Sequence, residues 1–100
     1  MKTVPEPDLI RALRVLALSN QERMKLIANS YQYRDLSGVG SWFLENINDL
    51  APALHKRGWV EYAEFTHTPG QVVVTTGQGD VRAVVITELG RQQLNVAVAN

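Results

Sequence analysis

Residues 50–61, LAPALHKRGWVE, mark the point where a helical pattern changes into a strand pattern. The apolar residues of the helical part are spaced by four, three and four positions, and they are Phe43, Ile47, Leu50 and Leu54. This spacing is typical of one buried helix face. Gly58 follows where a left-handed C-terminal cap is expected. The sequence therefore predicts a helix over residues 41–57 and a strand that begins at Trp59.

Pro52 lies inside this predicted helix. In a helix interior a proline costs about 3 kcal/mol, because it lacks the backbone donor and its ring crowds the preceding turn. If Asn48 or Asp49 caps a fresh helix, Pro52 falls in a first turn whose amides have no helical partner. We therefore expect a break or kink near Asn48.

Two further helices are predicted before this segment. Pro7 and Asp8 suit the start of the first helix, and its apolar stripe is Leu9, Ile10, Leu13, Leu16 and Ala17. Ser19 and Glu22 have the spacing of a capping box, which begins the second helix. Its buried face is expected to be Met24, Ile27, Ala28 and Tyr31. Residues 35–40 contain two glycines and predict a break.

The last third of the chain has the pattern of strands followed by a helix. Strands are expected over residues 59–65, 71–76 and 81–87, with turns at 68–70 and 77–80 and a helix over 88–98. Leu89, Leu94 and Val98 are available for packing on that helix, while Thr87 and Gly90 suit its N-terminus and local packing. Helices followed by a hairpin indicate an α+β fold, and 100 residues fit a single domain over 1–100.

Composition excludes several classes of function. The ten basic and ten acidic residues give a net charge of zero, which counts against a strong nucleic-acid binder. Residues 1–30 carry five basic and three acidic groups, residues 31–60 three of each, and residues 61–100 two and four. Without cysteine, and with His55 and His67 as the two histidines, no metal site is expected.

Catalysis and membrane insertion have no support in the sequence. It contains no nucleophile elbow, phosphate loop or zinc-protease helix motif, so we expect neither an enzyme nor a cofactor. The apolar runs are far too short for a membrane span, and we expect a cytoplasmic protein without a membrane partner.

Three short motifs follow one another in the order found in a known family. They are the helix end of residues 50–61, the hairpin segment Asp80-Val81-Arg82, and ITELGR at residues 86–91. Over residues 41–94 the chain resembles the multiple-antibiotic-resistance regulator (MarR) family and, more loosely, PadR-like proteins. The resemblance implies a winged helix-turn-helix with three or four helices, a two- or three-stranded antiparallel wing and a C-terminal helix.

The resemblance also implies where DNA would bind. The recognition helix falls near residues 46–57 and would enter the major groove, and the wing near residues 77–83 would enter the minor groove. The DNA-binding residues implied are Asn46, Asn48, Asp49, His55, Lys56, Arg57, Asp80 and Arg82. Asparagine can pair with adenine and aspartate can accept from cytosine, whereas basic residues near the helix end would meet phosphates. Asp80 would orient Arg82.

Each of these residues also has a structural interpretation. The asparagines and Asp49 could cap a helix, and residues 55–57 favour the negative end of a helix dipole without any partner. Arg82 could be an ordinary solvated hairpin residue. The connection over residues 61–80 is longer than the family's and leaves room for an extra strand, and the family's long flanking helices are mostly missing.

Two functions from different classes remain. The first is a DNA-binding transcription regulator that acts as a homodimer on double-stranded DNA, with the first helix and residues 89–98 as dimer surfaces; an effector molecule is not identified. The second is a winged-helix protein-interaction module or adaptor subunit without DNA binding. The balanced charge, the acidic pair Glu61 and Glu64, and the valine-rich residues 72–74 favour the second.

Overall fold

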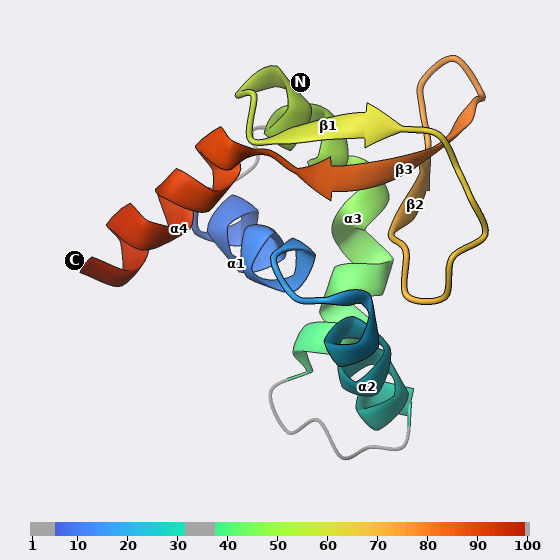
Figure 1. Cartoon of the computed structure of the whole chain (residues 1–100), viewed down its shortest axis with the longest axis horizontal. Helices are drawn as coiled ribbons and strands as arrows, with labels where there is room; N and C mark the ends of the chain where they lie inside the picture. The colour runs from blue at the N-terminus through green and yellow to red at the C-terminus, as the bar shows by residue number, and fades with distance from the viewer. Residues whose placement is uncertain (1–5, 32–37, 100) are drawn as a thin grey trace.

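The computed structural model describes residues 6–31 and 38–99, which form four helices and three strands (Figure 1). The elements are α1 (Glu6–Leu16), α2 (Asn20–Tyr31), α3 (Val39–Lys56), β1 (Val60–Ala63), β2 (Val73–Thr75), β3 (Val81–Ile86) and α4 (Glu88–Ala99). The predicted α+β class is confirmed, and the three strands form one antiparallel sheet in the order β1-β3-β2. Within the described residues, every helix is too short or too polar to span a membrane.

One face of the sheet packs against the helices. Val60 lies opposite Ile86, and Val74 lies opposite Arg82. Because side chains alternate between the two faces of a strand, Ile86, Val84 and Arg82 share one face of β3. Val84 and Ile86 are buried in the core, so this is the face that looks toward α1 and α3.

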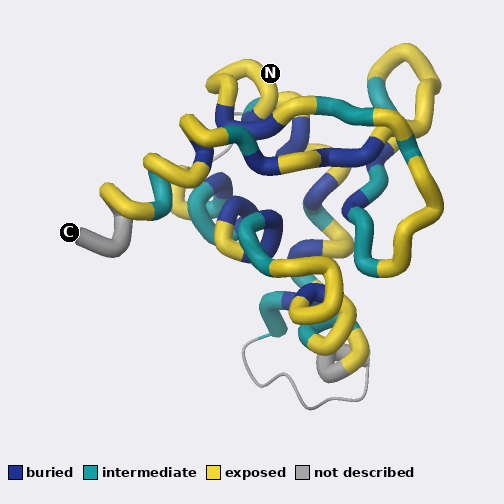
Figure 2. The backbone as a smooth tube through the Cα atoms, viewed as in Figure 1, coloured by how far each residue is buried: buried dark blue, intermediate teal, exposed yellow. Residues whose placement is uncertain are grey.

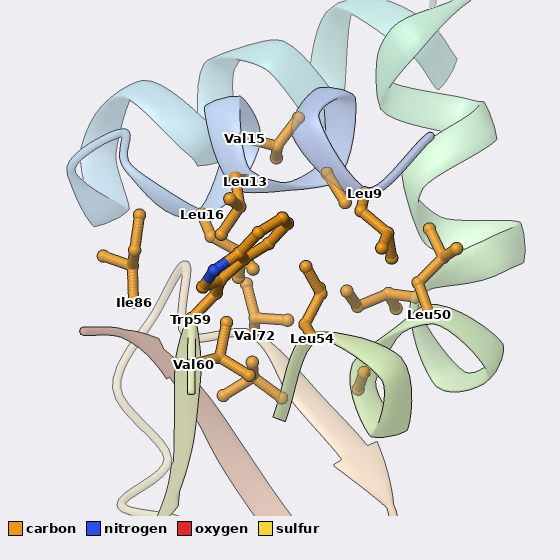
Figure 3. Packing of buried hydrophobic residues seen from close by; sticks show 14 of the residues in the cluster. Leu9, Leu13, Val15, Leu16, Leu50, Leu54, Trp59, Val60, Val72 and Ile86 are labelled. Atoms are coloured by element: carbon orange, nitrogen blue, oxygen red, sulfur yellow. The ribbon is translucent and has the colours of Figure 1, made fainter. Parts of the chain in front are cut away.

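The buried side chains of α1, α3 and the sheet form one cluster (Figure 3), and Figure 2 shows which stretches of these elements are buried. Every member of the predicted α3 stripe is buried: Phe43, Ile47, Leu50 and Leu54. On α1 the predicted leucines are buried, while Ile10 and Ala17 pack partly against the cluster. Trp59 lies between α1 and the start of the sheet, where it fills the space beside Leu13 and Leu16 (Figure 3).

The predicted break near Asn48 is wrong. Helix α3 runs without interruption from Val39 to Lys56, and Pro52 lies inside it. The proline ring is exposed to solvent. It removes the amide that would bond to the carbonyl of Asn48, but on this outer side water can satisfy that carbonyl. The buried face carries no such defect and holds the helix together.

The predicted buried face of α2 is also wrong. Met24 is 47% exposed and Ala28 is exposed, whereas Arg23 is only 6% exposed. Leu26 packs partly against the core beside Ile27, which is half-buried. The predicted contacts of Tyr31 and Val98 concern side chains outside the described part of the chain, and residues 35–37 of the predicted break also lie outside it. The last two residues of that break, 39 and 40, are helical, because α3 begins at Val39.

Arg23 replaces the predicted apolar contact of α2. Its guanidinium donates to the carbonyls of Val15, Leu16, Leu18 and Gly70 and to Oδ1 of Asn20. These bonds join the end of α1, the start of α2 and the β1–β2 connection. Burial lowers the pKa of Arg23 from its ordinary value, but guanidinium remains charged at neutral pH.

Local signals for caps and turns are confirmed. The amide of Glu22 donates to Ser19 Oγ, and the amide of Ser19 donates to Glu22 Oε1, both at 3.1 Å. Gly58 follows α3 with φ 77°, the left-handed conformation predicted for it. The β2–β3 turn closes through the amide of Thr76, which donates to the carbonyl of Asp80 at 2.8 Å.

Thr87 joins the end of α3 to the start of α4. Its hydroxyl donates to the carbonyl of Gly58 at 2.6 Å and accepts from the amide of Gly90 at 3.1 Å. A Cβ on Gly90 would overlap the carbonyl oxygen of Trp59. The predicted roles of Thr87 and Gly90 are therefore confirmed, and Leu94 packs partly against the core while Leu89 is exposed.

Candidate nucleic-acid interface

The outer face of α3 is open to solvent along its whole length. Its exposed residues include Ser41, Glu45, Asn48, Asp49, Pro52, His55 and Lys56. They lie opposite the buried stripe, as the helical period requires. The acidic groups of this face are Glu45, in the N-terminal half of α3, and Asp49, just past its middle, and the basic group Lys56 is at its C-terminal end.

The β2–β3 hairpin places Arg82 on the side of α3. Arg82 shares its strand face with Val84 and Ile86, which are buried against the helices. It lies near the strand start, where the side chain is 47% exposed. Asp80 Oδ2 lies 4.0 Å from Arg82 Nη2, an ion-pair distance that is too long for a hydrogen bond. Both groups are solvated, so this pair contributes little to stability.

An open hollow separates the C-terminal half of α3 from the hairpin tip. Its volume is about 530 Å³. It is lined by Pro52, His55, Tyr62, Thr76, Gly77, Gln78, Asp80 and Arg82. The hollow therefore has a helix on one side, the hairpin turn on the other and a residue of β1 between them.

An aromatic pair supports the hollow. The rings of His55 and Tyr62 stack, with centroids 4.6 Å apart and planes inclined by 30°. Partial burial raises the pKa of Tyr62 above its ordinary value, so the phenol is neutral at physiological pH. This stack fixes the imidazole of α3 against the sheet and keeps the helix end at a set distance from β1.

The structure brings together three of the eight predicted site residues. His55, Asp80 and Arg82 line the hollow. Asn48 lies close by, since its Oδ1 accepts the amide of Thr75 in β2 at 3.2 Å. Asp49 and Lys56 are exposed on α3 but do not line the hollow.

The other two predicted residues interact within their own surroundings. Asn46 is half-buried, and its Nδ2 donates to the carbonyl of Trp42 at 2.8 Å. Arg57 lies over the ring of Trp59, with its Cζ 5.5 Å from the ring centroid. Neither asparagine caps a new helix, so the capping interpretation is wrong. Arg57 follows the C-terminus of α3, and its Nη1 donates to the carbonyl of Ala53 at 3.4 Å, which agrees with the interpretation of a basic residue at the negative end of the helix.

Several residues of the hollow were not among the predicted site residues. Pro52 was interpreted as a helix breaker, Tyr62 and Thr76 as strand residues, and Gln78 as a turn residue. The alternation of β1 puts Tyr62 on the side of Val60, a signal that could have directed it toward α3. The position of the turn residues beside α3 depends on contacts between distant segments, and the sequence pattern carries no signal for it.

Within the described residues, no group of three or more histidine, aspartate or glutamate side chains could hold a metal ion. The charged groups around the hollow are of both signs, with Lys56 and Arg82 opposed by Asp49 and Asp80. The site can therefore offer hydrogen bonds and two cations to a polyanion, in a field that is not uniformly positive.

No family model, curated protein or solved structure matches this chain. Function is therefore inferred from the α+β architecture and from the geometry of α3 and the β2–β3 hairpin.

Proposed function

We propose that this protein is a winged helix-turn-helix domain that binds double-stranded DNA and regulates transcription in the cytoplasm. One observation carries the proposal. The exposed C-terminal half of α3 and the tip of the β2–β3 hairpin border the same hollow, and Arg82 stands on the hairpin face that looks toward α3. A helix and a hairpin tip that project side by side suit two neighbouring parts of a duplex.

In this proposal α3 enters the major groove with its exposed face. Asp49 can accept a hydrogen bond from cytosine there, and Lys56 meets the phosphates. The hairpin tip follows the adjacent backbone, so that Arg82 reaches phosphates or a narrow minor groove, where negative potential is greatest. Binding rather than catalysis is the role proposed for His55 and Asp80.

A net charge of zero means that one copy of the domain makes few phosphate contacts. Pairing of two copies doubles these contacts, and we propose a homodimer that uses α1 and α4. Apolar side chains on α4 support this choice, because Val96 is 55% exposed and Leu89 is 44% exposed. A small-molecule effector is not part of the proposal.

The test is fluorescence anisotropy with labelled random-sequence and upstream duplexes at low and moderate salt. We expect the affinity to fall steeply as salt rises, because bound phosphates release counterions. An affinity that does not change with salt contradicts phosphate contact.

Charge removal locates the surface. Replacing Arg82 and Lys56 together by alanine should weaken binding by about tenfold or more, since each contact to phosphate contributes on the order of 1 kcal/mol. The matched control is the alanine replacement of Arg14 and Arg91, exposed residues of α1 and α4 that remove the same charge. Because α1 and α4 are the proposed dimer surface, the two double variants are compared at equal dimer content, measured by sedimentation velocity. An equal loss of DNA affinity in both double variants would overturn the assignment of α3 and the hairpin tip as the DNA-binding surface.

A second candidate has its own observation. The sheet face that looks away from the helices exposes Val81 and Val85 of β3, which supports a protein-interaction module without DNA binding. Replacing both valines by threonine should leave DNA affinity unchanged if the first proposal holds. Absence of any DNA binding by the unmodified chain would favour this second candidate.

A further inference from the structure

A side chain of α3 holds the hairpin. Asn48 is exposed in the middle of α3, and its Oδ1 accepts the amide of Thr75 at 3.2 Å. Thr75 is the last residue of β2, directly before the hairpin turn. The bond therefore connects the helix to the base of the hairpin tip across 27 positions of sequence.

The hydrogen bonds between β2 and β3 show why the amide of Thr75 points away from β3. The amide of Val84 donates to the carbonyl of Val72, and the amide of Thr76 donates to the carbonyl of Asp80, so residues 72 and 76 of this segment face β3. In an antiparallel pair, successive residues direct their backbone groups to opposite edges. The amide of Thr75 therefore points to the outer edge of β2, where Asn48 satisfies it.

Val74, which lies opposite Arg82, is buried in the core, but the hairpin tip beyond it has little other support. Strand β1 ends at Ala63, opposite Ala83, so Val81 and Arg82 have a neighbouring strand only in β2 within the described sheet. A two-stranded ribbon that extends beyond its sheet is marginally stable alone. Its position relative to α3 depends on the side chains that connect the two.

We propose that Asn48 is a positioning residue, which fixes the β2–β3 hairpin against α3 and thereby sets where Arg82 stands. This replaces the role of base contact that the family resemblance implies for Asn48. Bidentate pairing with adenine needs both Oδ1 and Nδ2 of an asparagine. Here one lone pair of Oδ1 already accepts from Thr75, which fixes the orientation of the amide group toward β2, so Asn48 serves the interface by holding the hairpin. The consequence for DNA rests on the function proposed above.

Hydrogen exchange of the Thr75 amide, measured by NMR on the free protein, tests the contact itself. Asn48→Ala should raise the exchange rate about fivefold to tenfold, the effect of losing one ordinary hydrogen bond. Asn48→Asp keeps an acceptor and should leave the rate close to that of the unmodified chain. Asn46→Ala is the control for this measurement, because its bond stays within α3. An unchanged Thr75 rate in Asn48→Ala overturns the proposal.

A double-mutant cycle tests how Asn48 affects DNA. If Asn48 acts by placing Arg82, Asn48→Ala weakens binding in the unmodified chain but adds little once Arg82 is alanine. Effects that add fully, together with a change in base preference, overturn the positioning role and restore direct base contact. If the unmodified chain binds no DNA, the proposed function fails, whereas the Thr75 exchange rate still decides whether Asn48 holds the hairpin.

Discussion

Arg23 shows how one charged side chain can serve as part of a core. All five N–H donors of its guanidinium bond to oxygens, four of which are main-chain carbonyls. The shortest of the five bonds, at 2.6 Å, joins Nη1 to the carbonyl of Gly70 in the β1–β2 connection. Burial of a cation is costly unless its donors are satisfied, and here they are. The residue therefore connects the end of α1, the start of α2 and the β1–β2 connection through hydrogen bonds.

Replacing Arg23 by methionine should lower the free energy of unfolding by about 2–4 kcal/mol, because several carbonyls lose their donor at once. The free energy of unfolding of Arg23→Lys should lie between those of the unmodified chain and the methionine variant, since an ammonium has three donors and lacks the planar fork. Urea unfolding monitored by tryptophan fluorescence measures both. A methionine variant as stable as the unmodified chain would show that water replaces the guanidinium without loss.

Gly90 is required by space rather than by backbone conformation. An alanine there would place its Cβ against the carbonyl oxygen of Trp59 and within 2.9 Å of Ile86 Cγ1. We expect Gly90→Ala to destabilise the fold by about 1–3 kcal/mol, the usual cost of overpacking. Gly77→Ala is the matched control, because a Cβ at Gly77 meets nothing within 4 Å. Thermal unfolding of the two variants should differ clearly, and equal midpoints would contradict the contact.

Among the elements, α3 has the clearest apolar repeat in the sequence, and it also contains a proline that interrupts its backbone hydrogen bonds. Its buried stripe was predicted residue by residue, because a helical repeat of apolar residues is a local pattern. Its continuity through Pro52 was not predicted, because propensity describes an isolated helix and packing decides the real one. Packing of the stripe against α1 and the sheet offsets the missing hydrogen bond.

Pro52→Ala should therefore stabilise the protein by about 1–2 kcal/mol. The restored amide can bond to the carbonyl of Asn48, although the proline's restriction of the unfolded chain is lost. Chemical unfolding measures the difference in free energy of unfolding between Pro52→Ala and the unmodified chain. Glu45→Ala, at another exposed position of α3, is the control and should change stability by less than about 0.5 kcal/mol. A lower stability of Pro52→Ala would mean that the ring itself contributes packing.

The start of α2 gives a pH-dependent prediction. Bonds from the backbone amide and hydroxyl of Ser19 hold the pKa of Glu22 below its ordinary value. A carboxylate with a lowered folded-state pKa stabilises the fold above its unfolded pKa, and this contribution is lost as pH falls through the folded value. The stability difference between the unmodified chain and Glu22→Gln should thus shrink from pH 7 toward pH 3. A difference that is constant across this range would contradict the capping box.

At the scale of the whole molecule, the sequence predicted what depends on neighbours in the chain. The α+β class, the order of elements, the caps at Ser19 and Gly58 and the hairpin turn all follow from local patterns. The contacts of Arg23 with Gly70 and of Asn48 with Thr75 span 47 and 27 positions. No periodic pattern encodes such bonds, which explains why the inner face of α2 was predicted wrongly and why the bond of Asn48 to Thr75 was not predicted.

The distribution of charge over the molecule yields a test that compares two equal changes. Glu45→Gln and Glu6→Gln each raise the net charge by one, but Glu45 is on the exposed face of α3 and Glu6 lies at the start of α1. Removing a carboxylate near phosphates should improve DNA affinity several-fold, and a charge beyond roughly 10 Å is largely screened. Anisotropy titrations should therefore show a gain for Glu45→Gln alone. Equal gains would show that DNA does not approach through α3.

The oxygen of Thr87 links the movements of two helices. Because one hydroxyl group is bonded both to the residue that terminates α3 and to the first turn of α4, α4 cannot swing outward without breaking a bond to Gly58. A force applied to the C-terminal helix is therefore transmitted to the segment that carries His55 and Lys56. Valine has nearly the shape of threonine without the hydroxyl, and at this position it would remove this one link, while the backbone amide of residue 87 would still donate to the carbonyl of Trp59.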